Sequence, residues 1–83
     1  MKLVITADAL KALLRMPARD AAGLRDKLTR FAADPYGAHP WAKGFGGPSG
    51  RMSHGDWRAV YDIDGAMLTV LIVKIGNRKE VYR

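Results

Sequence analysis

The first 34 residues carry an apolar pattern that predicts one strand followed by two helices. Residues 2–6, KLVIT, form a short β-branched run that is typical of a strand. Apolar residues then recur at helical spacing before Pro17 and again between Pro17 and Pro35. The tight connection predicts a helical hairpin. The stripes expected to face the core are Ala7, Leu10, Leu13 and Leu14 in the first helix, and Ala21, Leu24, Leu28, Phe31 and Ala32 in the second.

The second half of the chain alternates at the period of β-strands. Strands are expected near 50–54, over 57–63 and over 67–75, with turns at HGD and DGA between them. The last of these, MLTVLIVKI, is apolar throughout most of its length, so we expect a central strand covered on both faces. EVY at 80–82 is expected to form a final short strand. The predicted fold is therefore a single α+β domain, 1–83, in which an N-terminal strand and a helical hairpin pack on a four- to five-stranded, mainly antiparallel sheet.

Residues 35–50 interrupt these patterns. Five glycines and three prolines in this stretch predict one long irregular loop. The loop carries the aromatic side chains of Trp41 and Phe45. We expect them to pack the helices onto the sheet instead of stacking on nucleic-acid bases. The GFGGPSG segment lacks the Lys-Ser/Thr ending and following helix of a phosphate-binding loop, so we reject that interpretation.

Charge narrows the class of partner. The 83-residue chain has 14 Lys and Arg against 8 Asp and Glu, a formal net charge of +6. Such a small basic domain suits an anionic partner, which includes nucleic acid, an acidic protein or a membrane surface, although the charge can also serve solubility alone. The absence of cysteine fits a reducing cytoplasm. The N-terminal segment resembles neither a transmembrane helix nor a signal peptide.

A candidate anion site emerges from the strand alternation. Arg58 shares a strand face with Val60 and Asp62, and an arginine planted in mid-strand is costly unless it meets an anion. If the hairpins pair in sequence order, four side chains converge on one surface: Arg51, Arg58, Arg78 and Tyr82. Guanidiniums match phosphate geometry, and a tyrosine among cations is a candidate general base because positive charge stabilises its phenolate.

The alternative is that these arginines pair with acidic neighbours: Asp56, Asp62, Asp64 and Glu80. The two aspartates beside the DGA turn are also typical turn formers. His39 and His54 can be considered as an acid–base pair, but as two unlinked histidines in loop or turn sequence they are expected to be surface residues. No His, Asp or Glu triplet has metal-binding spacing, so no metal or other cofactor is expected.

The second half of the chain resembles the RelE toxins of bacterial toxin–antitoxin systems. The likeness rests on Arg51, GDWR at 55–58, Tyr61, the apolar strand, GNR at 76–78 and EVY at 80–82. The N-terminal strand, two helices and KGFGG stretch beginning at Lys43 fit the same layout. The resemblance implies a small α/β fold, a RelB-like antitoxin partner and cytoplasmic location. It also implies a metal-independent endoribonuclease that acts on mRNA in the A site of the 70S ribosome, beside 16S rRNA.

Residue roles follow from that resemblance alone. The substrate's 2′-hydroxyl would attack the adjacent phosphate, with Tyr82 as base or stacking group, and the products would be a 2′,3′-cyclic phosphate and a 5′-hydroxyl. Arg78 would assist the leaving oxygen, while Arg51 and Arg58 would stabilise charge on the phosphate. Further RNA-contacting positions would be Lys43, Ser53, His54, Lys74, Lys79 and Arg83.

One position departs from the family pattern. Ser53 stands where well-studied relatives have a second cation, and regular alternation would turn His54 to the opposite face. A displaced turn or Lys43 would compensate for the missing cation; otherwise the activity would be slow or altered in specificity. Two alternatives stay open. One is a ParE-like toxin that inhibits DNA gyrase without cutting RNA, against which the terminal Arg78 and Tyr82 argue. The other is a catalytically weakened antitoxin-binding domain.

Overall fold

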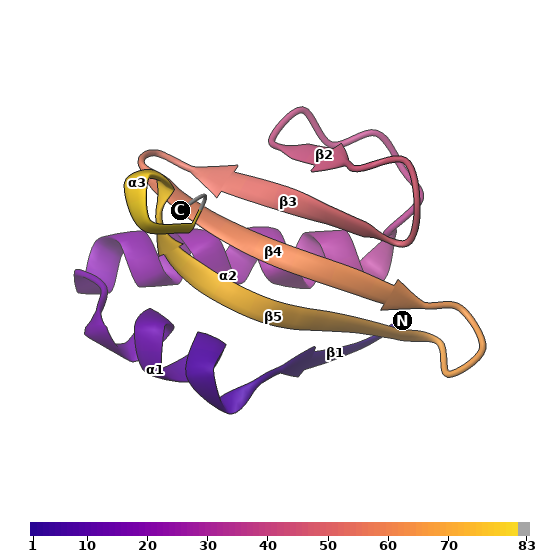
Figure 1. Cartoon of the computed structure of the whole chain (residues 1–83), viewed down its shortest axis with the longest axis horizontal. Coiled ribbons are helices and arrows are strands. Elements are labelled where there is room, and N and C mark those ends of the chain that lie inside the picture. The colour runs from indigo at the N-terminus through magenta and orange to yellow at the C-terminus, as the bar shows by residue number, and fades with distance from the viewer. Residues whose placement is uncertain (82–83) are drawn as a thin grey trace.

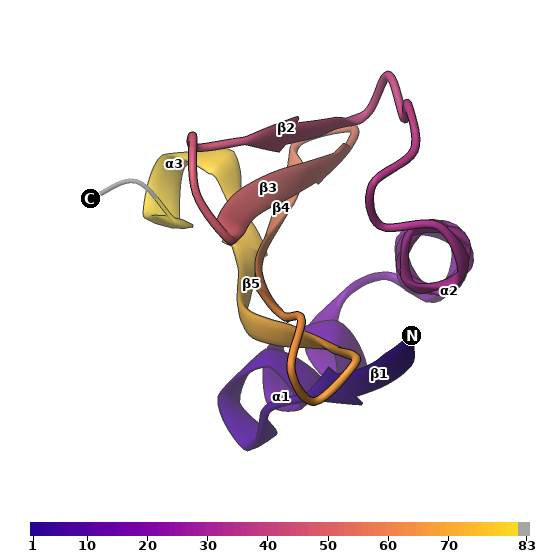
Figure 2. The ribbon, with the colours of Figure 1, turned by 90° about the vertical axis from the view of Figure 1, so that its right-hand side faces the viewer.

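The chain folds into a five-stranded mixed sheet with two long helices packed on one face (Figures 1 and 2). The computed structural model describes residues 1–81. The elements are β1 (Lys2–Ile5), α1 (Ala7–Arg15), α2 (Ala18–Ala33), β2 (Ala42–Gly44), β3 (Ser49–His54), β4 (Trp57–Asp64), β5 (Thr69–Asn77) and α3 (Arg78–Val81). The sheet order is β1-β5-β4-β3-β2. Strand β1 runs parallel to β5, and all the remaining neighbouring pairs are antiparallel. The predicted α+β fold is confirmed.

Both helices contribute one apolar face to a single core. Thr6 caps α1 by accepting a hydrogen bond from the Ala9 N–H at 3.4 Å, and Pro17 precedes α2. The fully buried side chains with the largest volumes are Phe31, Leu13, Leu24, Leu28, Met52, Ile72 and Val70. They come from α1, α2, β3 and β5, so the helices and the sheet close on the same interior.

The predicted stripe of α1 is only partly correct. Leu13 is buried, together with Ala9, but Leu14 is 67% exposed and Leu10 is 40% exposed. Both leucines line hollows on the surface near α1 and α2. This helix lies at the margin of the domain, where β5 is its main contact, so only one side of it can be covered.

The predicted long loop contains a strand that sequence reasoning did not foresee. Its residues Ala42–Gly44 form β2, which pairs with β3 at the edge of the sheet. Trp41 packs against the core as predicted, with its ring 4.8 Å from that of His39. The same prediction for Phe45 is wrong: its side chain is 55% exposed, because it lies in the turn that links β2 to β3.

Two further predictions concerning the C-terminal half need correction. The described part of the expected strand at 80–82 belongs to α3, where the Asn77 side-chain oxygen accepts a hydrogen bond from the Lys79 N–H at 3.1 Å. The apolar strand begins at Thr69 instead of residue 67 and is not covered on both faces. A bulge opposite Val60 and Tyr61 leaves Val73 unpaired in the ladder, and Val73 and Lys74 are exposed because helices α1 and α2 cover the other face.

Candidate functional site

Four cations lie on the face of the sheet that α1 and α2 leave open. Lys43 of β2 is opposite Arg51 of β3, and Arg51 is opposite Val60 of β4, which in turn is opposite Lys74 of β5. Arg58 lies two residues from Val60, on the same face. Directly paired residues project from the same face of an antiparallel sheet. We call Lys43, Arg51, Arg58 and Lys74 the basic face.

The alternation along β3 and β4 explains this arrangement. Met52, Ala59 and Tyr61 are buried toward the helices, so the residues between them point to the other side. The register thus brings Arg51 and Arg58 together as the strand pattern predicts. Four like charges on one surface create a positive potential that attracts anions.

Arg58 is held by backbone carbonyls. Its Nη1 donates hydrogen bonds to the carbonyl oxygens of Gly55 at 2.7 Å and Trp57 at 2.9 Å. Its Nε is buried and has no hydrogen-bond partner among residues 1–81. Within the same residues no carboxylate forms an ion pair with Arg58. The guanidinium is therefore oriented by the backbone and not by a carboxylate of residues 1–81.

The alternative of acidic pairing holds for Arg78. The Nε of Arg78 lies 3.8 Å from a carboxylate oxygen of Asp56, and the two side chains are 58% and 74% exposed. A long, solvated pair of this kind is weak, so it can be exchanged for a phosphate. Asp62 instead accepts a hydrogen bond from the Ser49 hydroxyl, and Asp64 accepts one from the Met67 N–H as a turn former, which confirms that prediction for Asp64.

Helix α3 brings Arg78 to the same end of the sheet as Arg58. Figure 2 shows α3 on the side of the sheet opposite α2. Val81 is buried against Gly76, which pairs with Arg58. The backbone N–H of Arg78 donates to the Asp56 carbonyl at 2.7 Å. One short turn, Gly55–Asp56, thus contacts both arginines. The sequence did not predict that this turn contacts the two arginines. Every residue has a backbone carbonyl, so residue types do not indicate which carbonyls accept hydrogen bonds.

The remaining predicted contact residues divide into three groups. Ser53 faces the basic side opposite Arg58, and Lys79 is exposed on α3. His54 is not part of the basic face: it points toward α2, as regular alternation requires, and its Nε2 lies 4.0 Å from a carboxylate oxygen of Asp20. Tyr82 and Arg83 lie outside the described residues, so their roles stay predictions.

The two histidines and Tyr61 lie on the helix side of the sheet, away from the basic face. The Nε2 atom of His39 lies 2.7 Å from the carbonyl oxygen of Asp34, and the ring packs beside Phe31 on the helix side of the sheet. Tyr61 lies on that side too, 4.5 Å from Phe31 between ring centroids. Burial raises the pKa of Tyr61, which keeps its hydroxyl protonated near neutral pH.

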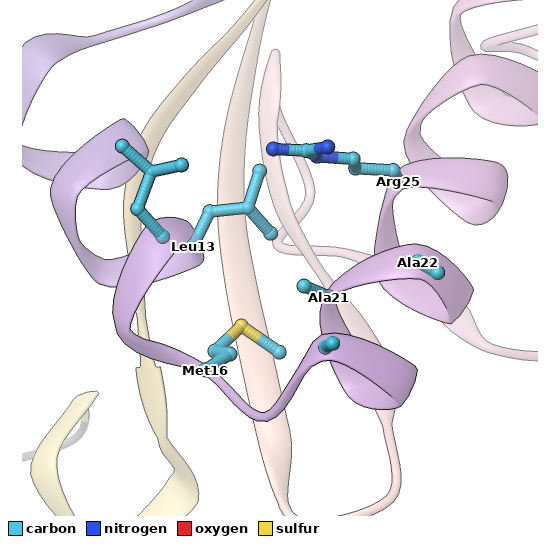
Figure 3. A pocket seen from close by; sticks show the side chains of 7 residues that line it. Leu13, Met16, Ala21, Ala22 and Arg25 are labelled. Carbon is cyan, nitrogen blue, oxygen red and sulfur yellow. The ribbon is translucent and has the colours of Figure 1, made fainter.

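The hollows on the helix side are lined mainly by apolar side chains. One, of about 250 Å³, is lined by Leu13, Leu14, Met16, Ala18, Ala21, Ala22 and Arg25. Figure 3 shows the Arg25 side chain extending toward Leu13 from α2. Among the described residues that line it, Arg25 is the one with a charge, and none carries a carboxylate or a nucleophile. In the described part of the chain no three His, Asp or Glu side chains form a metal-binding group, and no helix is long and apolar enough to cross a membrane.

The arrangement of sheet and helices is that of known RelE and ParE toxins. The isolated RelE toxin of Escherichia coli superimposes with a TM-score of 0.78 at 23% identity, over 98% of this chain and 89% of that one. A chain of the RelBE2 toxin–antitoxin complex from Mycobacterium tuberculosis gives 0.75 at 21% identity, over 93% and 96%. The YoeB/ParE toxin of Agrobacterium tumefaciens superimposes with a TM-score of 0.75 at 18% identity, over 93% of this chain and 98% of that one. These likenesses define a RelE/ParE-type toxin fold.

Sequence comparison supplies the family. Residues 3–82 match the family model described as the ParE toxin of type II toxin–antitoxin system, parDE. The chain therefore belongs to this family, and it is a toxin of the RelE/ParE superfamily of type II toxin–antitoxin systems. A search of curated proteins gives no match.

Proposed function

We propose that this toxin is an endoribonuclease that cleaves mRNA in the A site of the ribosome, in the cytoplasm. The observation that carries the proposal is the basic face, with Arg58 oriented by two carbonyl oxygens and unpaired with any carboxylate in residues 1–81. Charged donors that are fixed before the reaction stabilise developing negative charge most effectively, because they need no reorganisation in the transition state.

The reaction is an internal transfer at one phosphodiester. The 2′-oxygen of the substrate attacks the adjacent phosphorus as its proton passes to a base, and the bond from phosphorus to the 5′-oxygen breaks. The 5′-oxygen gains a proton, which leaves a 5′-hydroxyl and a 2′,3′-cyclic phosphate. Arg51 and Arg58 would stabilise the extra charge on the non-bridging oxygens, and Arg78 would donate a hydrogen bond to the leaving oxygen. Tyr82 is proposed as the base.

The lysines are assigned a different task. Lys43 and Lys74 are exposed at the two ends of the row across β2–β5, and Lys79 is exposed on α3. Flexible ammonium groups contact phosphates without demanding geometry, so these residues would hold the backbone of mRNA or 16S rRNA. The requirement for a 2′-hydroxyl restricts the chemistry to RNA.

Ser53 lowers the rate that we expect. It faces Arg58 across the ladder but brings no charge to the site. Loss of one charged donor typically costs about 10²–10³ in rate. Lys43 lies directly opposite Arg51, and its ammonium group would recover part of this loss. We therefore propose a slow nuclease.

An acidic, RelB-like antitoxin is the proposed partner. Several of the structurally similar chains come from toxin–antitoxin complexes, including the intact RelBE complex of Escherichia coli and an archaeal RelE–RelB complex from Pyrococcus horikoshii. The net charge of +6 favours an acidic protein that covers the basic face and blocks RNA access.

A second function is favoured by one observation: the family model that matches this chain is described as ParE. ParE-like toxins inhibit DNA gyrase and do not cleave RNA. In that case the basic face would bind DNA or an acidic surface of the enzyme, and the orientation of Arg58 would serve binding alone.

One paired experiment separates the two functions. Purified toxin is incubated with 70S ribosomes programmed with a defined mRNA, and the RNA ends are mapped; a parallel reaction measures gyrase supercoiling. The proposal predicts cleavage in the A-site codon, lost in Arg78→Ala and Tyr82→Phe, with supercoiling unaffected. Intact mRNA with blocked supercoiling would establish the ParE-like function instead.

A further inference from the structure

The turn that holds Arg58 on the open face is itself anchored from the opposite face. Its flanking residues, His54 and Trp57, close the hairpin of β3 and β4 and point toward α2. The indole Nε1 of Trp57 donates to a carboxylate oxygen of Asp20 at 3.3 Å. The other oxygen of the same carboxylate lies 4.0 Å from His54 Nε2. A single acidic group on the helix thus spans both sides of the turn.

Two neighbours on α2 complete this anchor. Gly23 lies one turn after Asp20, and a Cβ added there would collide with the His54 ring, so only glycine allows the imidazole to lie this close to the helix. Lys27 comes one turn later and donates from Nζ to the Ser53 carbonyl at 2.9 Å. Spacings of three and four residues put all three positions on one face of α2.

We propose that Asp20 is a positioning residue for the arginines of the active site. Its carboxylate holds Trp57 through a hydrogen bond and lies beside His54, and these two contacts restrain the backbone of the turn between them. The Gly55 and Trp57 carbonyls then orient the Arg58 guanidinium, while the Asp56 carbonyl holds the backbone N–H of Arg78. This inference rests on the proposed function, since it assigns Asp20 a task in that same site.

The placement of Gly55 makes such an anchor useful. Its φ of +59° lies in the left-handed region, so the turn has a specific conformation that its small, exposed residues do not stabilise by packing. A hairpin end without buried side chains of its own opens easily. Contacts from α2 restrict that motion, and a displacement of about 1 Å at a reacting group can cost about 10²-fold in rate.

The test combines activity with a direct view of Arg58. In Asp20→Ala we expect the single-turnover cleavage rate on programmed ribosomes to fall about tenfold, with KM within about twofold. The Nε–Hε resonance of Arg58 in ¹⁵N-labelled toxin should shift or broaden. Trp57→Phe, which removes the donor, should reproduce both effects. Asp20→Asn keeps an acceptor oxygen and should recover most of the rate.

Asp26→Ala is the matched control. Asp26 lies on the same helix and pairs with Arg30 at 3.0 Å, away from the turn, so its loss should leave the rate and the Arg58 resonance unchanged. Circular dichroism melting checks that each variant is folded. An Arg58 resonance in Asp20→Ala identical to that of the wild type overturns the positioning role, whatever the rate does. If the wild-type toxin cleaves nothing, the proposed function fails, and the Arg58 resonance alone then decides whether Asp20 positions this arginine.

Discussion

The two faces of the sheet use the same strands in opposite ways. On the helix side, Met52 and Ala59 are fully buried, and Tyr61 packs against Phe31. On the open side, Arg51 and Arg58 alternate with those same residues along β3 and β4. The first face stabilises the fold by removing apolar surface from water, whereas the second gathers like charges. Stability and proposed chemistry therefore occupy alternate positions of the same strands, so each can be changed separately.

The largest effect on the helix side should come from a core truncation. Leu24 is fully buried between α2 and the sheet, and Leu24→Ala is expected to lower the free energy of unfolding by about 2–5 kcal/mol. Urea unfolding followed by circular dichroism measures the loss. Leu14→Ala, at a residue that is 67% exposed, is the control and should change the free energy of unfolding by less than about 1 kcal/mol.

The matching change on the open side should leave the fold intact and remove activity. Arg58→Ala is expected to reduce A-site cleavage by about 10²–10³-fold, because it removes an oriented donor to the phosphate. Its free energy of unfolding should stay within about 1 kcal/mol of the wild type, since no ion pair within residues 1–81 is broken. An Arg58→Ala variant that keeps full activity would disprove the assigned role.

The sequence predicted some features of these two faces and not others. Alternation predicted that Arg51 and Arg58 share a face and that His54 leaves it, because side-chain direction in a strand depends only on local geometry. Helical spacing failed for Leu14, and the expected packing of the ring failed for Phe45, because the exposure of both depends on where the domain ends in space. The strand within 35–50 was missed because β2 is three residues long in a Gly-rich segment and forms by pairing with β3 across a short turn.

Ser53 offers a gain-of-function test of the open face. Ser53→Lys places a cation opposite Arg58, where the family pattern has one, and is expected to raise the cleavage rate by about tenfold if the missing charge limits activity. Single-turnover kinetics on programmed ribosomes measures the change. A rate equal to the wild type would show that Ser53 is not what limits this toxin.

Lys74 should affect binding more than chemistry. Removing this exposed lysine in Lys74→Ala deletes one phosphate contact, so the slope of log affinity for single-stranded RNA against log salt should decrease by about 0.7. Fluorescence anisotropy at several salt concentrations gives the slope. Lys11→Ala, a lysine exposed on α1, is the control and should leave the slope unchanged.

The smallest effect concerns Tyr61 and alkaline pH. Because burial raises the pKa of this phenol in the folded state, the unfolded chain loses the proton first as pH rises. The contribution of Tyr61 to the free energy of unfolding is therefore fully present below about pH 10, the ordinary tyrosine pKa, and declines above it. Tyr61→Phe should flatten this alkaline decline in urea unfolding, whereas a decline of unchanged steepness would exclude Tyr61 as its source.

The proposed role of the basic face is to promote attack by a 2′-hydroxyl of the substrate. The most direct measurement uses two mRNAs on programmed 70S ribosomes, one entirely ribose and one with a single 2′-deoxynucleotide on the 5′ side of the mapped cleavage site. Cleavage of the first to a 2′,3′-cyclic phosphate, with the second left intact, is the predicted result. Cleavage of both substrates, or of neither, would contradict it.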